Sequence, residues 1–387
     1  MPQPTLAEVF AAHWPGYVER HRPHLAAAHY RAARAILACR TPERGMVRRV
    51  CVRCGAAHLA PLSCGHRACP QCGTAQARQW EARRAAKLLP VPHFLVTLTV
   101  PEELRGLLHG RAGYGAMFAA STVAMRQSVG AHLGGEPGWT AVLHTWTRQL
   151  ARHPHLHLIV AGCAVTHEGA RREVCRGDYL VPGALLAARW RDALLAALRH
   201  AASTDPKLEA ALAGVPPETW TRRWVVDVQP VGRGETALRY LARYVQKTAL
   251  DHARLLRLDA GSVSIGWRER PQRPGERRGL PRRTRLDPDL FLRRFLAHVL
   301  PSGFQRVRHG GFYSAAARER YARLAALLGH SPPRPIEDPW QPGCPHCGGA
   351  MQVTEIHVGR VVLIPRRFRV ETSIAPIPAI TTLERAP

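Results

Sequence analysis

Acidic residues are scarce in this chain of 387 residues: 28 aspartates and glutamates stand against 55 lysines and arginines, a net charge of +27. Lysine is scarcer still, because only Lys87, Lys207 and Lys247 occur and the positive charge is almost entirely arginine. The basic residues are spread along the length and are not confined to a tail. A field of this sign attracts polyanions, of which nucleic acid is the commonest, so the charge balance predicts a nucleic-acid-binding protein.

Long apolar runs are also missing. No stretch approaches the roughly 18 residues that a membrane span needs, and the N-terminal segment has no apolar signal-peptide core. We therefore expect a cytoplasmic, nucleoid-associated bacterial protein. In that compartment the ten cysteines are expected to be reduced thiols or metal ligands and not disulfides.

The hydrophobic periodicity predicts a mixture of helices and strands. Helical patterns cover residues 5–40, 74–89, 115–133, 184–202, 236–250, 288–299 and 314–328. Strand patterns cover residues 93–100, 140–146, 153–162 and 223–231. Strands and helices alternate irregularly through the middle of the chain, which is typical of an α+β fold with helices packed on a sheet.

The segment RYLARYVQK (239–247) is predicted to be helical. At about 100° per residue, Tyr240, Tyr244 and Lys247 fall within one narrow arc. The opposite side is apolar and is expected to dock on the sheet: Leu238, Leu241, Ala242, Val245 and Ala249. The two phenols therefore point away from the core face of this helix. Tyrosines at this spacing also occur simply as packing, and the helix alone does not separate the two interpretations.

The segment HPHLHLIVAG (153–162) places His153, His155 and His157 at every second position of a predicted strand. Alternate side chains share one face of a strand, with neighbours about 7 Å apart. Two imidazoles at i and i+2 can supply neutral nitrogen ligands to one divalent ion. The strand is therefore a candidate metal site in the same domain as the tyrosine helix.

Together, the two segments predict a site that cleaves phosphodiesters. A tyrosine hydroxyl with a pKa of about 10 is a poor nucleophile, but it can attack a phosphodiester that a metal ion polarises. Lys247, on the tyrosine face, could balance the charge of the transition state or position the phosphate. A compact ammonium among so many arginines favours a chemical role for this lysine.

Two C-x2-C pairs near the N-terminus have the spacing of a four-thiolate zinc site: Cys51 with Cys54, and Cys69 with Cys72. A closed site of this kind would be structural and would fold a module too poor in apolar residues to fold alone. Cys64 and His66 lie between the pairs, so ligand exchange or a second site stays open. The arginines around the block favour contact with DNA: Arg48, Arg49, Arg53 and Arg67.

A further motif, Cys344-Pro-His-Cys347, is half of a zinc ribbon. A lone C-x2-C pair is a weak signal, and His346 and His357 are the residues that could complete it. The remaining cysteines are interpreted as ordinary thiols: Cys39, Cys163 and Cys175.

Residues 267–285 carry eight arginines interrupted by proline and glycine, and we expect a basic loop there. Contact with the phosphate backbone is the favoured interpretation, because each neutralised phosphate releases counterions. Trp267 is a candidate for stacking on an unpaired base. The candidate DNA-binding residues are Arg268, Arg277, Arg278, Arg282 and Arg283.

These motifs resemble those of a known family. His155-Leu156-His157 resembles the histidine–hydrophobic–histidine (HUH) motif of rolling-circle endonucleases, and YLARYVQK resembles the two-tyrosine motif of that superfamily. The segments LHTWTRQLARHPHLHLIVAG and FLRRFLAHVLPSGFQRVRHGGF, with the N-terminal cysteine block, resemble transposases of the insertion sequence ninety-one family. The similarity extends over residues 10–350.

The resemblance implies an HUH-endonuclease-like antiparallel sheet with flanking helices, preceded by a small helical and zinc-binding domain. It implies a transposase that nicks and rejoins single-stranded DNA at element ends. Tyr240 or Tyr244 would form a 5′-phosphotyrosine link and leave a 3′-hydroxyl for host replication. His155 and His157 would hold Mg²⁺ or Mn²⁺. His153 completes our set of metal residues, and His144 and Gln149 are the other candidates for the third ligand.

We divide the chain into a helical and zinc-binding DNA-recognition domain (1–88), a nuclease domain (89–266), a basic helical region with a candidate zinc knuckle (267–370) and a disordered tail (371–387). Because the chain has no G-x-x-x-x-G-K-[ST] phosphate loop, any helicase is expected to come from the host. Two alternatives stay open: a plasmid or phage replication initiator with the same chemistry, and a zinc-dependent DNA-binding protein without catalysis.

Overall fold

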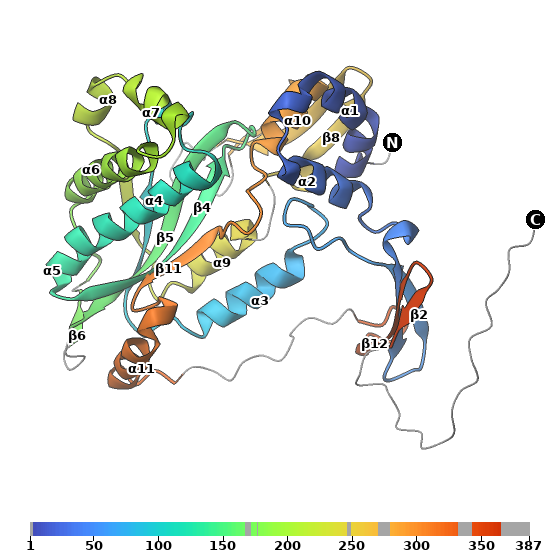
Figure 1. Ribbon diagram of the computed structural model, residues 1–387. Coiled ribbons are helices and arrows are strands. Elements are labelled where there is room, and N and C mark those ends of the chain that lie inside the picture. The colour runs from blue at the N-terminus through green and yellow to red at the C-terminus, as the bar shows by residue number, and fades with distance from the viewer. Residues whose placement is uncertain are drawn as a thin grey trace, which may run out of the picture. The chain divides into compact units, whose positions relative to one another are not determined.

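The computed structural model describes residues 3–166, 172–175, 177–245, 249–269, 279–331 and 343–364 (Figure 1). The chain forms two compact units. Unit 1 comprises residues 1–39 and 63–340, and unit 2 comprises residues 40–62 and 341–387. Each unit is therefore built from two separate segments of the chain, and unit 2 joins a segment near the N-terminus to the C-terminal segment.

The centre of unit 1 is an antiparallel sheet of six strands. Its order is β11 (Val307–Gly311), β4 (Glu136–Trp146), β5 (Arg152–Val165), β3 (His93–Leu98) and β7 (Val226–Pro230), and the short β6 (Arg172–Val174) also pairs with β5. The longest strand, β5, thus lies between β4 and β3. Its residues from 156 to 165 are all buried, because helices cover both faces of the sheet and its neighbours cover both edges.

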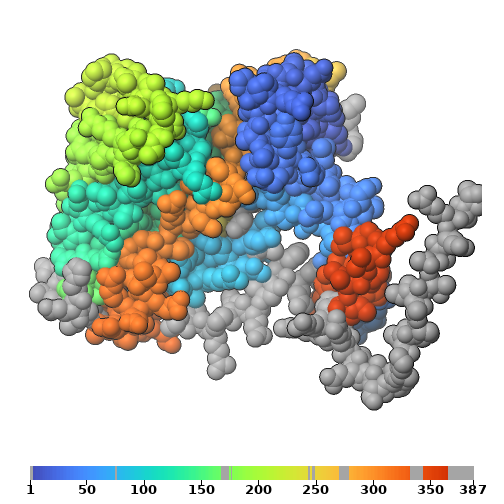
Figure 2. All heavy atoms as spheres, in the orientation of Figure 1, coloured from blue at the N-terminus to red at the C-terminus, as the bar shows by residue number. Residues whose placement is uncertain are grey.

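The two faces of this sheet carry different helices. On one face, α4 (Gly110–Met125) and α6 (Gly183–Ala202) pack over Phe94, Val96 and Leu158 in the largest apolar cluster of the described chain. On the other face, α3 (Thr74–Ala85) and α9 (Glu235–Val245) contact each other, and α9 packs on β4 and β5. Next to α6 lie α7 (Pro206–Ala213) and α8 (Glu218–Thr221). The atoms of these three helices form one continuous part of the molecular surface (Figure 2).

A second part of unit 1 surrounds a three-stranded antiparallel sheet. Its strands are β8 (Leu255–Asp259), β9 (Ser262–Arg268) and β10 (Pro281–Leu286), with β9 in the middle. One apolar cluster joins this sheet to α1 (Leu6–His21), α2 (Ala27–Leu37) and α10 (Pro288–Leu296). Asp287 caps α10 by accepting from the backbone N–H groups of Asp289 and Leu290, so the strand ends directly in a helix.

The C-terminal helix of unit 1, α11 (Arg318–Leu327), packs against residues 89–91 and β5 through Leu324 and Ala325. Short helices α5 (Ala131–Leu133) and a π-helical turn (Arg126–Gly130) extend α4 toward β4. No helix in the described residues is both long and apolar enough to cross a membrane.

Unit 2 is a four-stranded antiparallel sheet of order β13 (Val361–Leu363), β12 (Met351–Val358), β1 (Met46–Cys51) and β2 (Ala57–Pro61). The N-terminal hairpin β1–β2 pairs with the C-terminal hairpin β12–β13 through β1 and β12, in a register that sets Met46 opposite His357 and Cys51 opposite Met351. Arg48 of β1 also forms an ion pair with Glu355 of β12 at 3.0 Å.

The structure confirms the α+β class and most predicted elements. Each strand predicted at 93–100, 140–146, 153–162 and 223–231 is present, and so are the helices predicted in the described residues. The prediction of a continuous loop over residues 267–285 was wrong, because the two ends of this segment belong to strands β9 and β10, which pair with each other. Residues 270–278 and the tail from 371 lie outside the described residues. The domain boundaries stay a prediction, since unit 1 includes parts of three predicted domains and unit 2 joins part of the first to part of the third.

Buried neutral histidines predict an acid-sensitive fold. His93 and His298 are buried, and burial lowers the pKa of each to about 4. Between pH 6.5 and 4 the unfolded chain takes up protons that the folded chain excludes, so the free energy of unfolding falls as the pH falls. We expect a loss of about 1.5 kcal/mol for each histidine between pH 6.5 and pH 5 in urea denaturation.

His93→Asn is the matched variant for this expectation. The His93 Nδ1 lies 2.9 Å from the Val91 carbonyl, and an asparagine amide can donate to the same oxygen without titrating. The slope of stability against pH should therefore become shallower in this variant. An unchanged slope, or stability that rises on acidification, would contradict the assignment.

Candidate functional site

Three histidines converge at the centre of the large sheet. His155 and His157 lie on β5, and His144 lies on the neighbouring strand β4, where it pairs directly with His155. One ring nitrogen of each lies within 4.8 Å of those of the others, which is the spacing expected of ligands to a single ion. The ring centroids of His144 are 5.1 Å from His155 and 4.5 Å from His157.

The backbone and one hydroxyl orient two of these rings. The Nδ1 of His155 lies 2.7 Å from the carbonyl oxygen of His153, which can only accept, so Nδ1 carries the proton and Nε2 keeps its lone pair for an ion. The Nδ1 of His157 lies 3.0 Å from the hydroxyl of Thr97 on β3. Contacts of this kind fix the ring orientation and tautomer of metal-binding histidines.

Burial keeps the imidazoles of His144 and His157 neutral. It lowers the pKa of His157 to about 4 and that of His144 well below the ordinary value, and the neighbouring imidazoles lower the pKa of His144 further. A neutral imidazole is the form that binds a metal. The site is therefore ready to bind an ion at neutral pH without losing protons.

The prediction that His153 is a metal ligand is corrected. His153 is not in the group of converging nitrogens; its carbonyl oxygen orients His155 instead. Residues i, i+2 and i+4 of one strand span about 13 Å, too far for three of them to bind one ion. Directly paired residues on neighbouring strands lie about 5 Å apart, so β4 supplies the third imidazole through His144. Gln149 lies in the exposed turn between the strands.

Helix α9 brings a tyrosine to the same face of the sheet. Its predicted apolar stripe is buried as expected, with Leu238, Leu241 and Val245 packed on Val142 and Ile159 of the sheet. Tyr240, on the side of the helix away from this stripe, is 41% exposed.

The ring of Tyr240 meets the histidine cluster directly. Its centroid lies 6.2 Å from that of His157, at an interplanar angle of 87°. A phenol therefore stands beside the candidate metal ligands at the edge of solvent. The side chain of Tyr244 and the whole of Lys247 lie outside the described residues.

The donor set bears on which ion fits. Three neutral imidazoles offer only nitrogen, whereas Mg²⁺ prefers oxygen ligands and retained waters. Imidazole is a common ligand of first-row transition ions. Of the two expected ions, the residues fit Mn²⁺ better than Mg²⁺.

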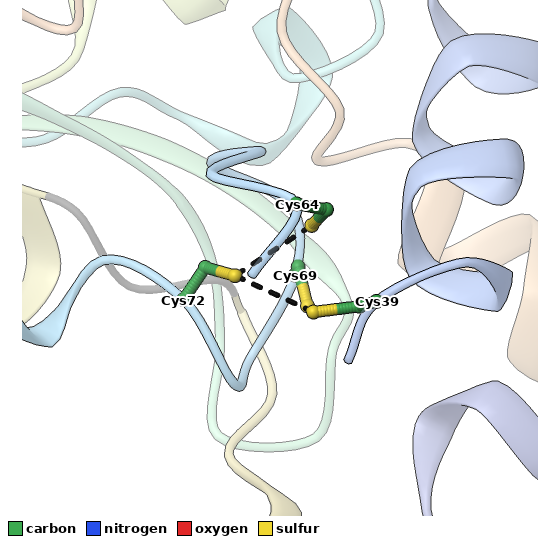
Figure 3. Close-up of side chains that lie close together, drawn as sticks. All are labelled: Cys39, Cys64, Cys69 and Cys72. Carbon is green, nitrogen blue, oxygen red and sulfur yellow. Dashed lines mark hydrogen bonds between the residues drawn. The ribbon is translucent and has the colours of Figure 1, made fainter. Parts of the chain in front are cut away.

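Four cysteines of unit 1 form a thiolate cluster. Cys39, just beyond the end of α2, meets Cys64, Cys69 and Cys72 from the loop before α3 (Figure 3). The Sγ of Cys72 lies 3.5 Å from that of Cys39 and 3.6 Å from that of Cys64. With a Zn–S distance of about 2.3 Å, the edges of a zinc tetrahedron are about 3.8 Å long, so the four sulfurs fit one zinc ion.

This cluster corrects the predicted zinc site. The structure separates the two C-x2-C pairs: Cys69 and Cys72 belong to unit 1, whereas Cys51 and Cys54 belong to unit 2 with Cys344 and Cys347. The pairs are close in sequence, but the hairpin β1–β2 leaves unit 1 between them. Cys64, predicted as an exchange ligand, is a full member of the unit 1 cluster.

Cys39, interpreted from the sequence as an ordinary thiol, lies in this cluster. The sequence feature that could have revealed this membership is the position of Cys39, at the end of a predicted helix shortly before the cysteine block. Arg67, predicted to touch DNA, donates to the backbone carbonyls of Leu300, Pro301 and Phe304, so it ties the cysteine loop to the segment that follows α10.

The arginines predicted to bind DNA lie partly on the hairpin β9–β10. Arg282 forms an ion pair with Glu269 at 2.7 Å, Arg283 donates to the Ser264 hydroxyl, and Arg268 donates to the Gly279 carbonyl. The guanidinium groups of these three arginines therefore contact other groups of the hairpin. Arg277 and Arg278 lie outside the described residues.

Comparisons with known proteins agree with these features. A family model described as "Putative transposase" matches residues 138–320, and one described as "Transposase zinc-binding domain" matches residues 9–100. The chain is 33% identical to "Putative transposase y4qJ" of Sinorhizobium fredii (strain NBRC 101917 / NGR234) over 86% of each chain. It is 25% identical to the "Transposase for insertion sequence element IS801" of Pseudomonas savastanoi pv. phaseolicola, over 59% of this chain and 57% of that protein. No solved structure matches the chain.

The hydroxyl of Thr97 is predicted to matter for metal affinity. Thr97→Val removes the group that orients His157 and should weaken Mn²⁺ binding by about 10-fold, as measured by titration calorimetry. Thr99→Val is the matched control, because the Thr99 hydroxyl donates to the Val225 carbonyl and contacts none of the three histidines. Equal affinity in the two variants would show that the hydroxyl does not position the ligand.

Cys39 is predicted to be a zinc ligand. Cys39→Ser should lower the zinc content of the purified protein by one ion per chain and lower its melting temperature. The control is Cys175→Ser, whose buried thiol lies outside both cysteine clusters. If Cys39→Ser retains the full zinc content, the four-thiolate assignment in unit 1 is wrong.

Proposed function

Since the chain belongs to the IS91 family of insertion-sequence transposases and carries its zinc-binding domain, we propose that it nicks and rejoins single-stranded DNA at element ends through a 5′-phosphotyrosine intermediate. The observation that carries the proposal is the contact between Tyr240 and the histidine cluster. This phenol is 41% exposed and lies beside three convergent imidazoles, where a phosphodiester could reach both.

The chemistry assigned to the chain is a pair of reversible transesterifications. The Tyr240 oxygen forms a bond to the phosphorus, the bond from phosphorus to the 3′-oxygen breaks, and that oxygen leaves as a 3′-hydroxyl with a proton taken from solvent. The phenolic proton is lost to solvent. Attack by a 3′-hydroxyl on the phosphotyrosine reverses the process and rejoins a strand, so bond energy is conserved and no ATP is consumed.

His144, His155 and His157 would hold the divalent ion. When bound, the ion polarises the scissile phosphate and neutralises its developing charge. The chain's own contribution is position: β4 and β5 fix the imidazoles, and α9 sets the phenol beside them. Tyr244 is assigned to the second cleavage or to strand transfer, and Lys247 to balancing charge at the phosphate.

The basic surface is proposed to hold the DNA. The hairpin arginines Arg268, Arg282 and Arg283, with Arg277 and Arg278, would neutralise phosphates of the single strand. Arg48, Arg49 and Arg53 of unit 2 are proposed to recognise the element end. Such a protein acts at the chromosome, in the nucleoid, and relies on the host for strand separation and replication.

The proposal predicts a covalent protein–DNA adduct. A labelled single-stranded oligonucleotide of the element end, incubated with the protein and Mn²⁺ and then denatured in SDS, should remain attached to the chain. Tyr240→Phe, Tyr244→Phe should reduce the adduct to background, because neither ring then carries a nucleophile. The single variants identify the residue that attacks first, which we expect to be Tyr240.

Tyr179→Phe is the matched control, since Tyr179 is a half-exposed tyrosine elsewhere in unit 1. It should form the adduct at the level of the unaltered protein. An adduct that persists in the double variant would exclude these tyrosines as the nucleophiles. Binding of the oligonucleotide without any adduct would support a non-catalytic DNA-binding protein instead.

A further inference from the structure

The second cysteine cluster joins two ends of the chain. Cys51 is the last residue of strand β1, and Cys54 follows it. Cys344 and Cys347 precede β12, almost 300 residues later. Their four sulfurs lie within 4.8 Å of one another, with Cys51 and Cys347 3.5 Å apart and Cys54 and Cys344 3.6 Å apart. We propose that they form a second, separate four-thiolate zinc site that fastens the C-terminal hairpin to the N-terminal one.

The distances favour a single metal ion over other uses of four thiols. A disulfide has an S–S length of about 2.05 Å, far below the separations in this cluster. The edges of a zinc tetrathiolate are about 3.8 Å long, close to both observed distances. An iron–sulfur cluster would insert several atoms between the thiolates and force them further apart.

The backbone around each pair forms the same turn. Each C-x2-C pair is followed by a glycine in the left-handed region, Gly55 and Gly348, both at a φ of 71°. The N–H of Gly55 donates to the Cys51 carbonyl at 3.0 Å, and that of Gly348 donates to the Cys344 carbonyl at 2.8 Å. Two equivalent turns thus present their sulfurs to one point from opposite sides.

Gly349 shows how closely the chain wraps this point. A Cβ at Gly349 would lie 3.2 Å from the Cys51 sulfur, 3.3 Å from the Cys347 sulfur and 3.0 Å from the Cβ of Arg53. Its carbonyl accepts from the N–H of Cys344 at 2.7 Å. A side chain here would press on two of the sulfurs by a few tenths of an ångström, so glycine lets the backbone lie close against them.

The apolar core is small in the part of unit 2 that the structure describes. Its buried apolar cluster consists of Cys51, Cys344 and Met351, with Ala56 and Cys347 packed against it. The outer hairpin leaves large apolar side chains exposed: Val358, Val361, Val362, Leu363 and Ile364. So small a core does not stabilise a four-stranded sheet, and a metal ion supplies folding free energy in such modules.

The site extends the zinc-binding region beyond its matched sequence. The zinc-binding family model ends at residue 100 and the transposase model at residue 320, so neither includes Cys344 or Cys347. The C-terminal segment is therefore a structural part of the N-terminal zinc module. A chain cut before residue 341 would lose Cys344, Cys347 and the hairpin β12–β13, and would keep the zinc site of unit 1.

Metal stoichiometry of the full chain tests the proposal. Elemental analysis of the purified protein should give two zinc ions per chain. Cys344→Ser, Cys347→Ser should lower this to one, and Cys69→Ser, Cys72→Ser should also lower it to one by emptying the other site. Cys175→Ser should leave two.

The inference would be overturned by one zinc per chain in the unaltered protein, by two in the Cys344→Ser, Cys347→Ser variant, or by iron in place of zinc. Loss of both ions in that variant would also overturn it, because the two sites would then not be separate.

A second readout separates metal loss from general misfolding. Hydrogen exchange should speed up in β1 and β12 of the Cys344→Ser, Cys347→Ser variant, while α6 in unit 1 keeps its protection. Unchanged protection in β1 and β12 would show that no ion fastens the two hairpins. Neither measurement depends on DNA cleavage, so a failure here leaves the proposed transposase chemistry standing, and the reverse also holds.

Discussion

The candidate active site depends on the register between strands β4 and β5. Direct pairing of His144 with His155 brings the third imidazole within reach of the two on β5. Side chains alternate between the faces of a sheet, so a slip of one residue would turn His144 toward the face covered by α4 and α6. The register is held because both strands are buried on both faces for most of their length. The packing that folds the domain therefore also fixes the geometry of the ligands.

Helix α9 extends this dependence to Tyr240, the proposed nucleophile. Leu238, Leu241 and Val245 pack on the histidine-bearing face of the sheet, at Val142 and Ile159, so the helix cannot rotate without uncovering them. Tyr240 is thereby held beside His157, at the border between the core and solvent. Because one apolar contact orients both partners, the phenol and the imidazoles are preorganised before DNA or metal arrives. The two cysteine clusters are separate from this site, and we propose that a zinc ion in each of them holds loop segments together.

Local features of the fold were predictable from the sequence, and long-range ones were not. The period of 3.6 identified the buried stripe of α9, and the period of 2 placed His155 and His157 on one face. His144 could be named only as one of several candidates, because cross-strand pairing leaves no mark in the local pattern. The cysteines show the same limit more strongly: Cys51 was paired with its neighbour Cys69 in sequence, whereas the fold pairs it with Cys347. Only the antiparallel pairing of β1 with β12 reveals that Cys347 is the partner of Cys51.

The central claim is that one divalent ion, three imidazoles and a tyrosine share a single site. Crystals grown with Mn²⁺ and a single-stranded oligonucleotide of the element end, measured at the manganese absorption edge, test it most directly. We predict one anomalous peak among His144, His155 and His157, with the scissile phosphate between that peak and the Tyr240 hydroxyl. A manganese peak elsewhere on the chain, or a Tyr240 side chain turned away from an ion bound by these histidines, would contradict the account.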